Sequence, residues 1–171
     1  DDALLARAWE ALAPLAAARI AHQRIDPETL VLVGEAVGLV DLDRARAAPR
    51  PERFVVDRAQ LLAATASLVG VERAADACVV ALGADGVAEL LPYLQPTALT
   101  VDQRRMMKAL DIDLDKLRTE VAEAARVESP PLIKMRRFTF GSVVKVALPA
   151  LAIVMLLSAL AGFDLEEFVT T

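Results

Sequence analysis

The residues best suited to chemistry lie between positions 22 and 57 of this 171-residue chain. They are His22, Arg24, Asp26, Pro27, Thr29, Asp41, Asp43 and Asp57. A carboxylate can accept the proton of an attacking hydroxyl group or hold a magnesium ion, and phosphoryl transfer needs both tasks. An arginine can do neither, because its guanidinium has no acceptor and stays protonated. The set therefore indicates a phosphotransferase-type centre from which parts are missing.

A short β-hairpin is expected to position these side chains. The apolar run LVLV at residues 30–33 and the run VGLV at residues 37–40 are typical of two strands, and Gly34 lies in the turn between them. The second strand sets Asp41 and Asp43 at its end, close to the loop that carries Asp26. We expect Arg24 to bond these three carboxylates and so to convert a catalytic centre into a structural joint.

The segment before the hairpin predicts a helix over residues 2–21, because its apolar residues are spaced three or four apart. Pro14 removes a backbone hydrogen bond and should kink this helix or split it in two. The helix should deliver His22 to the centre. Its imidazole is expected either to cap the helix end or to bond a nearby carbonyl group.

The loop and hairpin resemble the carboxy-terminal lobe of protein kinases and of the kinases that act on aminoglycosides and choline. Those proteins share a loop His-x-Asp-x-x-Pro-x-Asn, a hairpin, and then Asp-Phe-Gly or Asp-Phe-Asp. His22 and Pro27 match the loop, the two apolar runs match the hairpin, and Asp41 matches the metal-holding aspartate. The resemblance implies a structural role for the histidine and a weak metal site, if any, at Asp41.

Three positions depart from the kinase pattern. Arg24 stands where the catalytic aspartate is expected, Thr29 replaces the metal-binding asparagine, and Leu42-Asp43 replaces Phe-Gly. The base and one metal ligand are therefore missing. Asp57, near the start of a helix expected over residues 53–69, matches an aspartate that holds the catalytic-loop backbone in this fold. The other interpretation of Asp57 is a first-turn charge that suits the helix dipole.

The rest of the amino-terminal region predicts helices with identifiable ends. Gly83 should close a helix over residues 71–82, and Cys78 should lie on its apolar side. Further helices are expected over residues 84–94, from a Thr100–Gln103 capping box to about residue 110, and over residues 114–126. The predicted fold class is mainly α: the helical lobe of a kinase-like α+β fold with one short hairpin, followed by a transmembrane helix.

Composition agrees with a membrane-attached chain. Hydrophobic residues make up 56% of the sequence, which is high for a soluble protein. Residues 138–163 contain one charged residue, Lys145, and are long enough to span a bilayer. Lys134, Arg136 and Arg137 precede this segment and acidic residues follow it, so the positive-inside rule places residues 1–137 in the cytoplasm. A buried core helix is the other interpretation of the segment.

Small residues along residues 138–163 would let further transmembrane helices of this or a partner chain pack closely. The expected location is the plasma membrane, with the lipid bilayer as a partner. A single cysteine excludes a disulfide framework and fits a reducing compartment. The net charge of −5, with scattered basic residues, gives no sign of nucleic-acid binding.

A second resemblance covers essentially all of the chain from Ile20 onward. The segments LLAATASLVGVERA, VALGADGVAELLPYLQPTALT and MRRFTFGS, followed by the apolar span, resemble actinobacterial membrane proteins of the lysylphosphatidylglycerol-synthase transmembrane-region type, which are flippase-like. The resemblance implies a degenerate kinase-like cytoplasmic region at residues 1–127 and an association with lipid transport or synthesis. A basic linker at 128–137, the span at 138–163 and the start of a further element at 164–171 would follow.

These expectations support three functions. The first is a non-catalytic module that regulates or scaffolds a lipid-associated membrane protein, and the second is a membrane-anchored helical adaptor. The third is an active small-molecule phosphotransferase in which Asp26 or Asp43 replaces the missing base. No cofactor is expected: the Gly-rich loop and the strand lysine of a nucleotide site do not precede residue 20. Weak nucleotide or magnesium binding would need such a lobe upstream, in a longer protein.

Overall fold

The computed structural model describes residues 2–128, 131–133 and 155. The chain divides into two compact units, residues 1–135 and residues 136–171, and every element with described bounds lies in the first. The α-helices are α1 (Asp2–Glu10), α2 (Leu12–Ala17), α3 (Glu52–Val69), α4 (Val71–Leu90), α5 (Val101–Ala109) and α6 (Leu114–Ala125). The strands are β1 (Ile20–Ala21), β2 (Leu30–Val33), β3 (Ala36–Leu39) and β4 (Arg46–Ala47). Three 3₁₀ turns are η1 (Pro27–Thr29), η2 (Leu42–Arg44) and η3 (Leu91–Tyr93). The first unit is thus mainly helical, as predicted.

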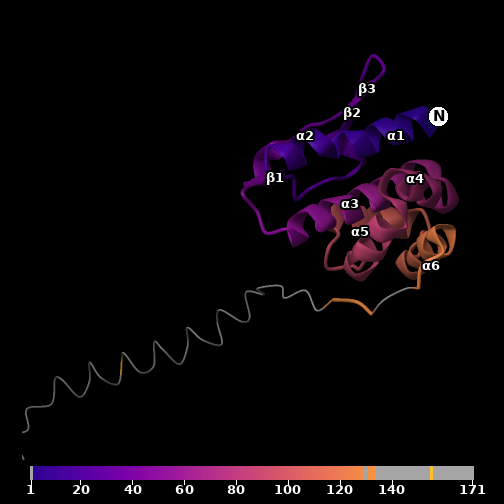
Figure 1. The fold of residues 1–171 in the computed structure, drawn as a ribbon. Coiled ribbons are helices and arrows are strands. Elements are labelled where there is room, and N and C mark those ends of the chain that lie inside the picture. The colour runs from indigo at the N-terminus through magenta and orange to yellow at the C-terminus, as the bar shows by residue number, and fades with distance from the viewer. Residues whose placement is uncertain (1, 129–130, 134–154, 156–171) are drawn as a thin grey trace, which may run out of the picture. The chain divides into compact units, whose positions relative to one another are not determined.

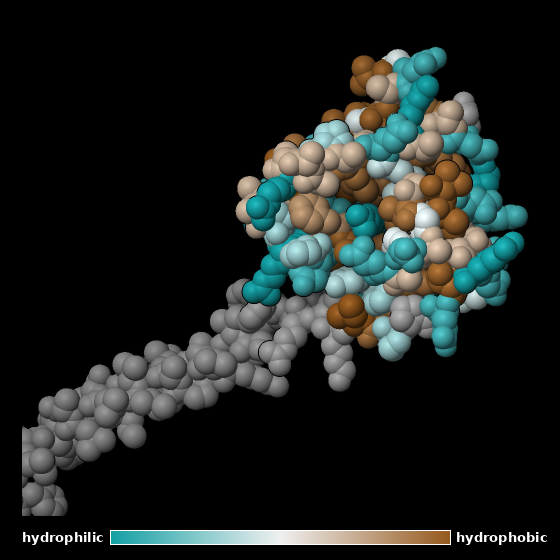
Figure 2. Space-filling view, viewed as in Figure 1, coloured by the Kyte–Doolittle hydropathy of each residue, from teal (hydrophilic) through white to brown (hydrophobic). Residues whose placement is uncertain are grey.

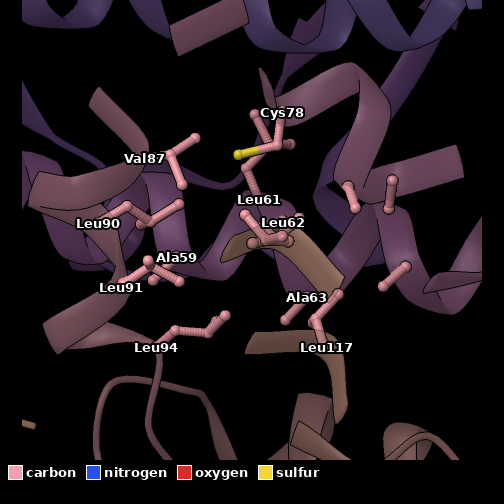
Figure 3. Packing of buried hydrophobic residues seen from close by; sticks show 14 of the residues in the cluster. Ala59, Leu61, Leu62, Ala63, Cys78, Val87, Leu90, Leu91, Leu94 and Leu117 are labelled. Carbon is pink, nitrogen blue, oxygen red and sulfur yellow. The ribbon is translucent and has the colours of Figure 1, made fainter. Parts of the chain in front are cut away.

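Helix α3 lies at the centre of the first unit. It packs against α4, α5 and α1, while α6 packs along α4 (Figure 1). Leu61 and Leu62 of α3 are completely buried, and Figure 3 shows them among side chains of α4 and α6, including Cys78 and Leu117. A helix that is apolar on most faces can be stable only where other elements cover it on most sides. The sequence pattern of α3 therefore places it in the core, as the structure does.

The first helix is split near Pro14, but it is also shorter than expected. Pro14 has no N–H to donate to the carbonyl of Glu10, so α1 ends there and α2 begins with Pro14 in its first turn. The prediction that the helix continues to residue 21 is wrong. Arg19 adopts a left-handed conformation with φ of 54°, and β1 follows it. His22 is thus delivered by a short strand rather than by a helix.

The predicted hairpin is present. Strands β2 and β3 pair antiparallel, with Leu30 opposite Leu39, and Gly34 takes a positive φ of 61° in the turn. The second strand begins one residue earlier than predicted, and its end still places Asp41 just beyond it. A second antiparallel pair, β1 with β4, was not predicted. Each of its strands has two residues, too short for a period-2 pattern to be read.

The helix ends follow local chemistry. Gly83 has φ of 67° and ψ of 177°, which is not helical, so α4 consists of two helices joined by a kink at Gly83, and the first of them ends there as predicted. Thr100 and Gln103 form the predicted capping box of α5, and the side chain of Asp113 caps α6.

Cys78 is fully buried in the core, as expected, and burial raises the pKa of its thiol to about 12. Its thiol is therefore unreactive at neutral pH.

The predicted membrane segment at residues 138–163 lies outside the described residues, except for Met155. The same is true of Lys134, Arg136, Arg137 and Lys145, which were expected to flank or begin it. Within the part of the chain that the structure describes, no helix has the length and apolar character needed to cross a bilayer. The membrane span therefore stays a prediction from sequence.

Candidate functional site

The backbone of the site loop, residues 22–29, is held by the side chain of Asp57 in α3. The Asp57 carboxylate accepts two backbone hydrogen bonds, from the N–H of His22 to Oδ2 (2.6 Å) and from the N–H of Gln23 to Oδ1 (2.8 Å). Asp57 is the sixth residue of α3, so its charge is not in the first turn of that helix. Burial raises the pKa of Asp57, and the two hydrogen bonds oppose that rise. The structure therefore shows the first interpretation of Asp57, in which its carboxylate holds the backbone of the loop.

Two glutamines hold the next part of the loop: Gln60, which the sequence analysis did not single out, and Gln103, which it named only for its part in a capping box. Gln60 Oε1 accepts the N–H of Ile25 (2.9 Å), and Gln60 Nε2 donates to the carbonyl of Ala98 (2.8 Å). Gln103 Nε2 donates to the carbonyls of Ile25 (2.6 Å) and Gln60 (2.7 Å). Both side chains are buried. The available signal for Gln60 was a polar amide inside the mainly apolar stretch of residues 59–66, since buried amides need partners.

His22 joins the site loop to the end of the hairpin. Its side chain is completely buried, and Nε2 lies 3.0 Å from the carbonyl oxygen of Val40. A carbonyl can only accept, so this ring nitrogen carries the hydrogen and donates it. The N–H of Val40 in turn donates to the carbonyl of Thr29 (3.0 Å). The imidazole therefore bonds a nearby carbonyl, one of the two roles expected for it, and acts as part of the framework.

Asp26, Pro27 and Thr29 form a closed turn. Asp26 Oδ1 accepts the N–H groups of Glu28 (3.1 Å) and Thr29 (3.2 Å), and the N–H of Asp26 donates to Thr29 Oγ1 (3.1 Å). Pro27 opens η1, where its missing N–H leaves no unpaired group. Asp26 and Thr29 are both buried. The hydroxyl of Thr29, which the resemblance to kinases compares with a metal-binding asparagine, is thus used within its own turn.

Arg24 forms ion pairs with two carboxylates, those of Asp41 and Asp26. Its Nη1 is 2.9 Å from Asp41 Oδ2, and its Nε is 3.5 Å from Asp26 Oδ2. The pKa of Arg24 is raised, mainly by Asp41 and less by Asp26 and Asp43. Among the described residues no ion pair joins Asp43 to Arg24. The predicted network of three carboxylates around Arg24 therefore contains two, and Asp43 acts on it only at longer range.

The donor set at Asp41 does not fit a magnesium site. Magnesium prefers several oxygen ligands in octahedral geometry, and the Asp41 carboxylate instead has a guanidinium 2.9 Å away. Within the described residues no three His, Cys, Asp or Glu side chains are grouped to hold a metal. Asp41 also has a left-handed backbone, with φ of 65°, and its side chain does not cap η2. The ion pairs of Arg24 with Asp41 and Asp26 can instead hold the end of the hairpin against the loop.

Comparisons with protein-family models, with curated proteins and with solved structures found no match to this chain. The assignment of a function therefore depends on the residues and geometry described above.

Proposed function

We propose that residues 2–128 are a non-catalytic module, similar to the helical lobe of kinases, that regulates or scaffolds an integral membrane protein associated with lipid transport or synthesis. The observation that carries the non-catalytic part is the 2.9 Å ion pair between Arg24 and Asp41. Asp41 is the residue that would hold a metal, and Arg24 stands where a proton acceptor is needed. A guanidinium can supply neither function.

The use of the remaining polar groups supports the same proposal. His22 donates to a backbone carbonyl, Thr29 Oγ1 bonds Asp26, and both oxygens of Asp57 accept loop N–H groups. In phosphoryl transfer the protein mainly positions substrate and offsets charge with metal ions and free side chains. Here the corresponding side chains are occupied by contacts within the chain. The loop retains a defined conformation without the groups that would carry a reaction.

The membrane part of the proposal rests on the apolar segment at residues 138–163 and on the basic residues before it. A segment of this length without charge in its centre is suited to a bilayer. The lipid association rests on the resemblance of the sequence to flippase-like proteins.

Turnover of ATP by the purified full chain tests the non-catalytic assignment. We expect no phosphate release above the protein-free blank, with or without magnesium, and no change in the parent's melting temperature on adding magnesium. Arg24→Asp should be destabilised, because it places a fourth acidic side chain beside Asp26, Asp41 and Asp43, and magnesium should partly rescue it. Turnover that disappears in Asp41→Asn would overturn the proposal.

Cysteine labelling of intact cells tests the membrane part. A cysteine placed at Glu128 should be protected from an impermeant thiol reagent, and one placed at Thr170 should be labelled. Permeabilised cells supply the control, because both positions should then react. Labelling at residue 128 without permeabilisation, together with protection at residue 170, would contradict the proposed orientation.

A helical adaptor is the second candidate, and the hairpin is the observation that favours it. Leu32 and Val33 are 58% and 71% exposed, and the hairpin extends away from the helices in Figure 1. Apolar residues also reach the surface among polar ones on the face drawn in Figure 2. A two-stranded sheet with exposed apolar side chains is suited to pairing with another chain. Loss of a co-purifying partner in Leu32→Ser/Val33→Ser would support this function over the first.

A further inference from the structure

A cavity of about 700 Å³ lies between the helices α1 and α2 on one side and α3 and α4 on the other. Figure 1 shows these two pairs of helices facing one another. Apolar side chains make up much of its lining: Leu5, Trp9, Leu12, Ile20, Phe54 and Val80. Sites for small ligands have this size and this mainly apolar character. The cavity also reaches Asp57, the residue that holds the site loop.

Trp9 contributes an aromatic wall to the cavity. The side chain lines the cavity and the residue is only 6% exposed. The indole Nε1 is buried and has no hydrogen-bond partner among the described residues, so a molecule in the cavity meets the ring rather than this nitrogen. An aromatic ring offers a large apolar surface against which an alkyl chain can pack.

The charges around the cavity favour a cation. Both arginines of the lining are already neutralised, Arg73 by Asp2 at 2.7 Å and Arg58 by Glu89 at 3.0 Å. Two exposed acids of the lining, Glu10 and Asp76, are in no ion pair among the described residues. The charge that remains uncompensated at the cavity is therefore negative. Complementary charge steers a ligand and selects its sign.

We propose that this cavity binds an amphiphile with an apolar chain and a cationic head group. The chain lies against the apolar walls, including the ring of Trp9, and the head group lies beside Glu10 and Asp76. The argument depends on the lining of the cavity alone and is independent of the proposed function.

The fluorescence of Trp9 reports directly on this site, because it is the single tryptophan of the chain. The full chain, in nanodiscs of zwitterionic lipid, is titrated with decanoylcholine below its micelle concentration, and empty nanodiscs serve as the blank. N-decanoylglycine is the comparison probe: it keeps the decanoyl chain and has an anionic head group in place of the cationic one.

We expect a saturable change in emission with decanoylcholine and about tenfold weaker binding of N-decanoylglycine, since two partly solvated charge contacts distinguish them. The double variant Glu10→Gln/Asp76→Gln should remove the preference for the cation and keep the melting temperature. Glu72→Gln/Glu123→Gln is the control, since these exposed acids are not in the lining. A response that does not saturate, equal affinity for cation and anion, or an unchanged preference in Glu10→Gln/Asp76→Gln would each overturn the proposal.

Discussion

The helices α3, α4 and α6 are held together by apolar side chains, whereas the site loop at residues 22–29 is held by hydrogen bonds from a few polar ones. Leu61, Leu62 and Leu117 are completely buried and have no polar atoms to satisfy. The loop instead depends on directional contacts, of which the two to Asp57 are 2.6 and 2.8 Å long. Both regions belong to the same unit.

Because the core and the loop are stabilised differently, we expect them to respond differently to substitution. Apolar burial is non-directional, so a core change affects the stability of the whole unit in proportion to the volume removed. A hydrogen bond contributes little net free energy, but removing one partner leaves the other buried and unsatisfied. Core substitutions should therefore unfold the unit, and loop substitutions should act more locally.

Leu62→Ala should have the largest effect. It removes a completely buried side chain from α3 and leaves a cavity, which lowers the free energy of unfolding by about 2–5 kcal/mol. Leu68→Ala is the matched control on the same helix, because Leu68 is 57% exposed and the change should stay within about 0.5 kcal/mol. Urea denaturation measures both. Equal effects at the two positions would contradict the view that burial alone stabilises this region.

Asp57→Asn should have an intermediate effect. The amide has one acceptor oxygen instead of two, so either the buried N–H of His22 or the partly buried N–H of Gln23 loses its acceptor, at a cost of about 1–3 kcal/mol. Hydrogen exchange should accelerate at those two amides more than in α3. Asp115→Asn, on the exposed face of α6, is the control for the loss of charge and should change little.

The pH dependence of Asp57→Asn sharpens the same comparison. Burial raises the pKa of Asp57, so the folded state binds this proton more tightly than the unfolded state does. The stabilisation from this residue is then complete below the ordinary pKa of an aspartate and is lost as the pH rises through the raised value. The stability difference between the parent and Asp57→Asn should be larger at acidic than at neutral pH. A difference that grows toward neutral pH would mean that the hydrogen bonds outweigh burial.

Arg24→Ala should have the smallest effect of the three. The Arg24 side chain is 26% exposed, so water and salt weaken its contacts with Asp41 and Asp26. The melting temperature should fall less than in Asp57→Asn, and high salt should reduce the difference from the parent. Arg24→Lys should retain part of the effect, since it keeps the charge but not the planar fork. No change at low salt would show that the ion pairs do not hold the hairpin.

Several features could be predicted from sequence because they depend on residues close together in the chain. The Thr100–Gln103 capping box, the Asp113 cap and the turn at Gly34 involve partners within a few positions. The position of α3 in the core followed from its apolar composition, which needs no knowledge of its neighbours. The contact of Asp57 with the loop could be expected only from the resemblance to kinases, because spacing alone left a second interpretation open.

Only the tertiary structure decided the contacts between residues far apart in sequence. Gln103 reaches Ile25 across 78 positions, and Gln60 reaches the same residue across 35. Which of Asp26, Asp41 and Asp43 approach Arg24 also depends on how the hairpin lies on the loop, and one of the three was predicted wrongly. A hydrogen bond or ion pair requires atoms within a few ångströms, and local propensity does not fix positions that closely between distant segments. The sequence alone therefore determined the later helices, the β2–β3 hairpin and the types of residue at the site, whereas the β1–β4 pair and the choice of contacts depended on how α3, α5 and the hairpin pack.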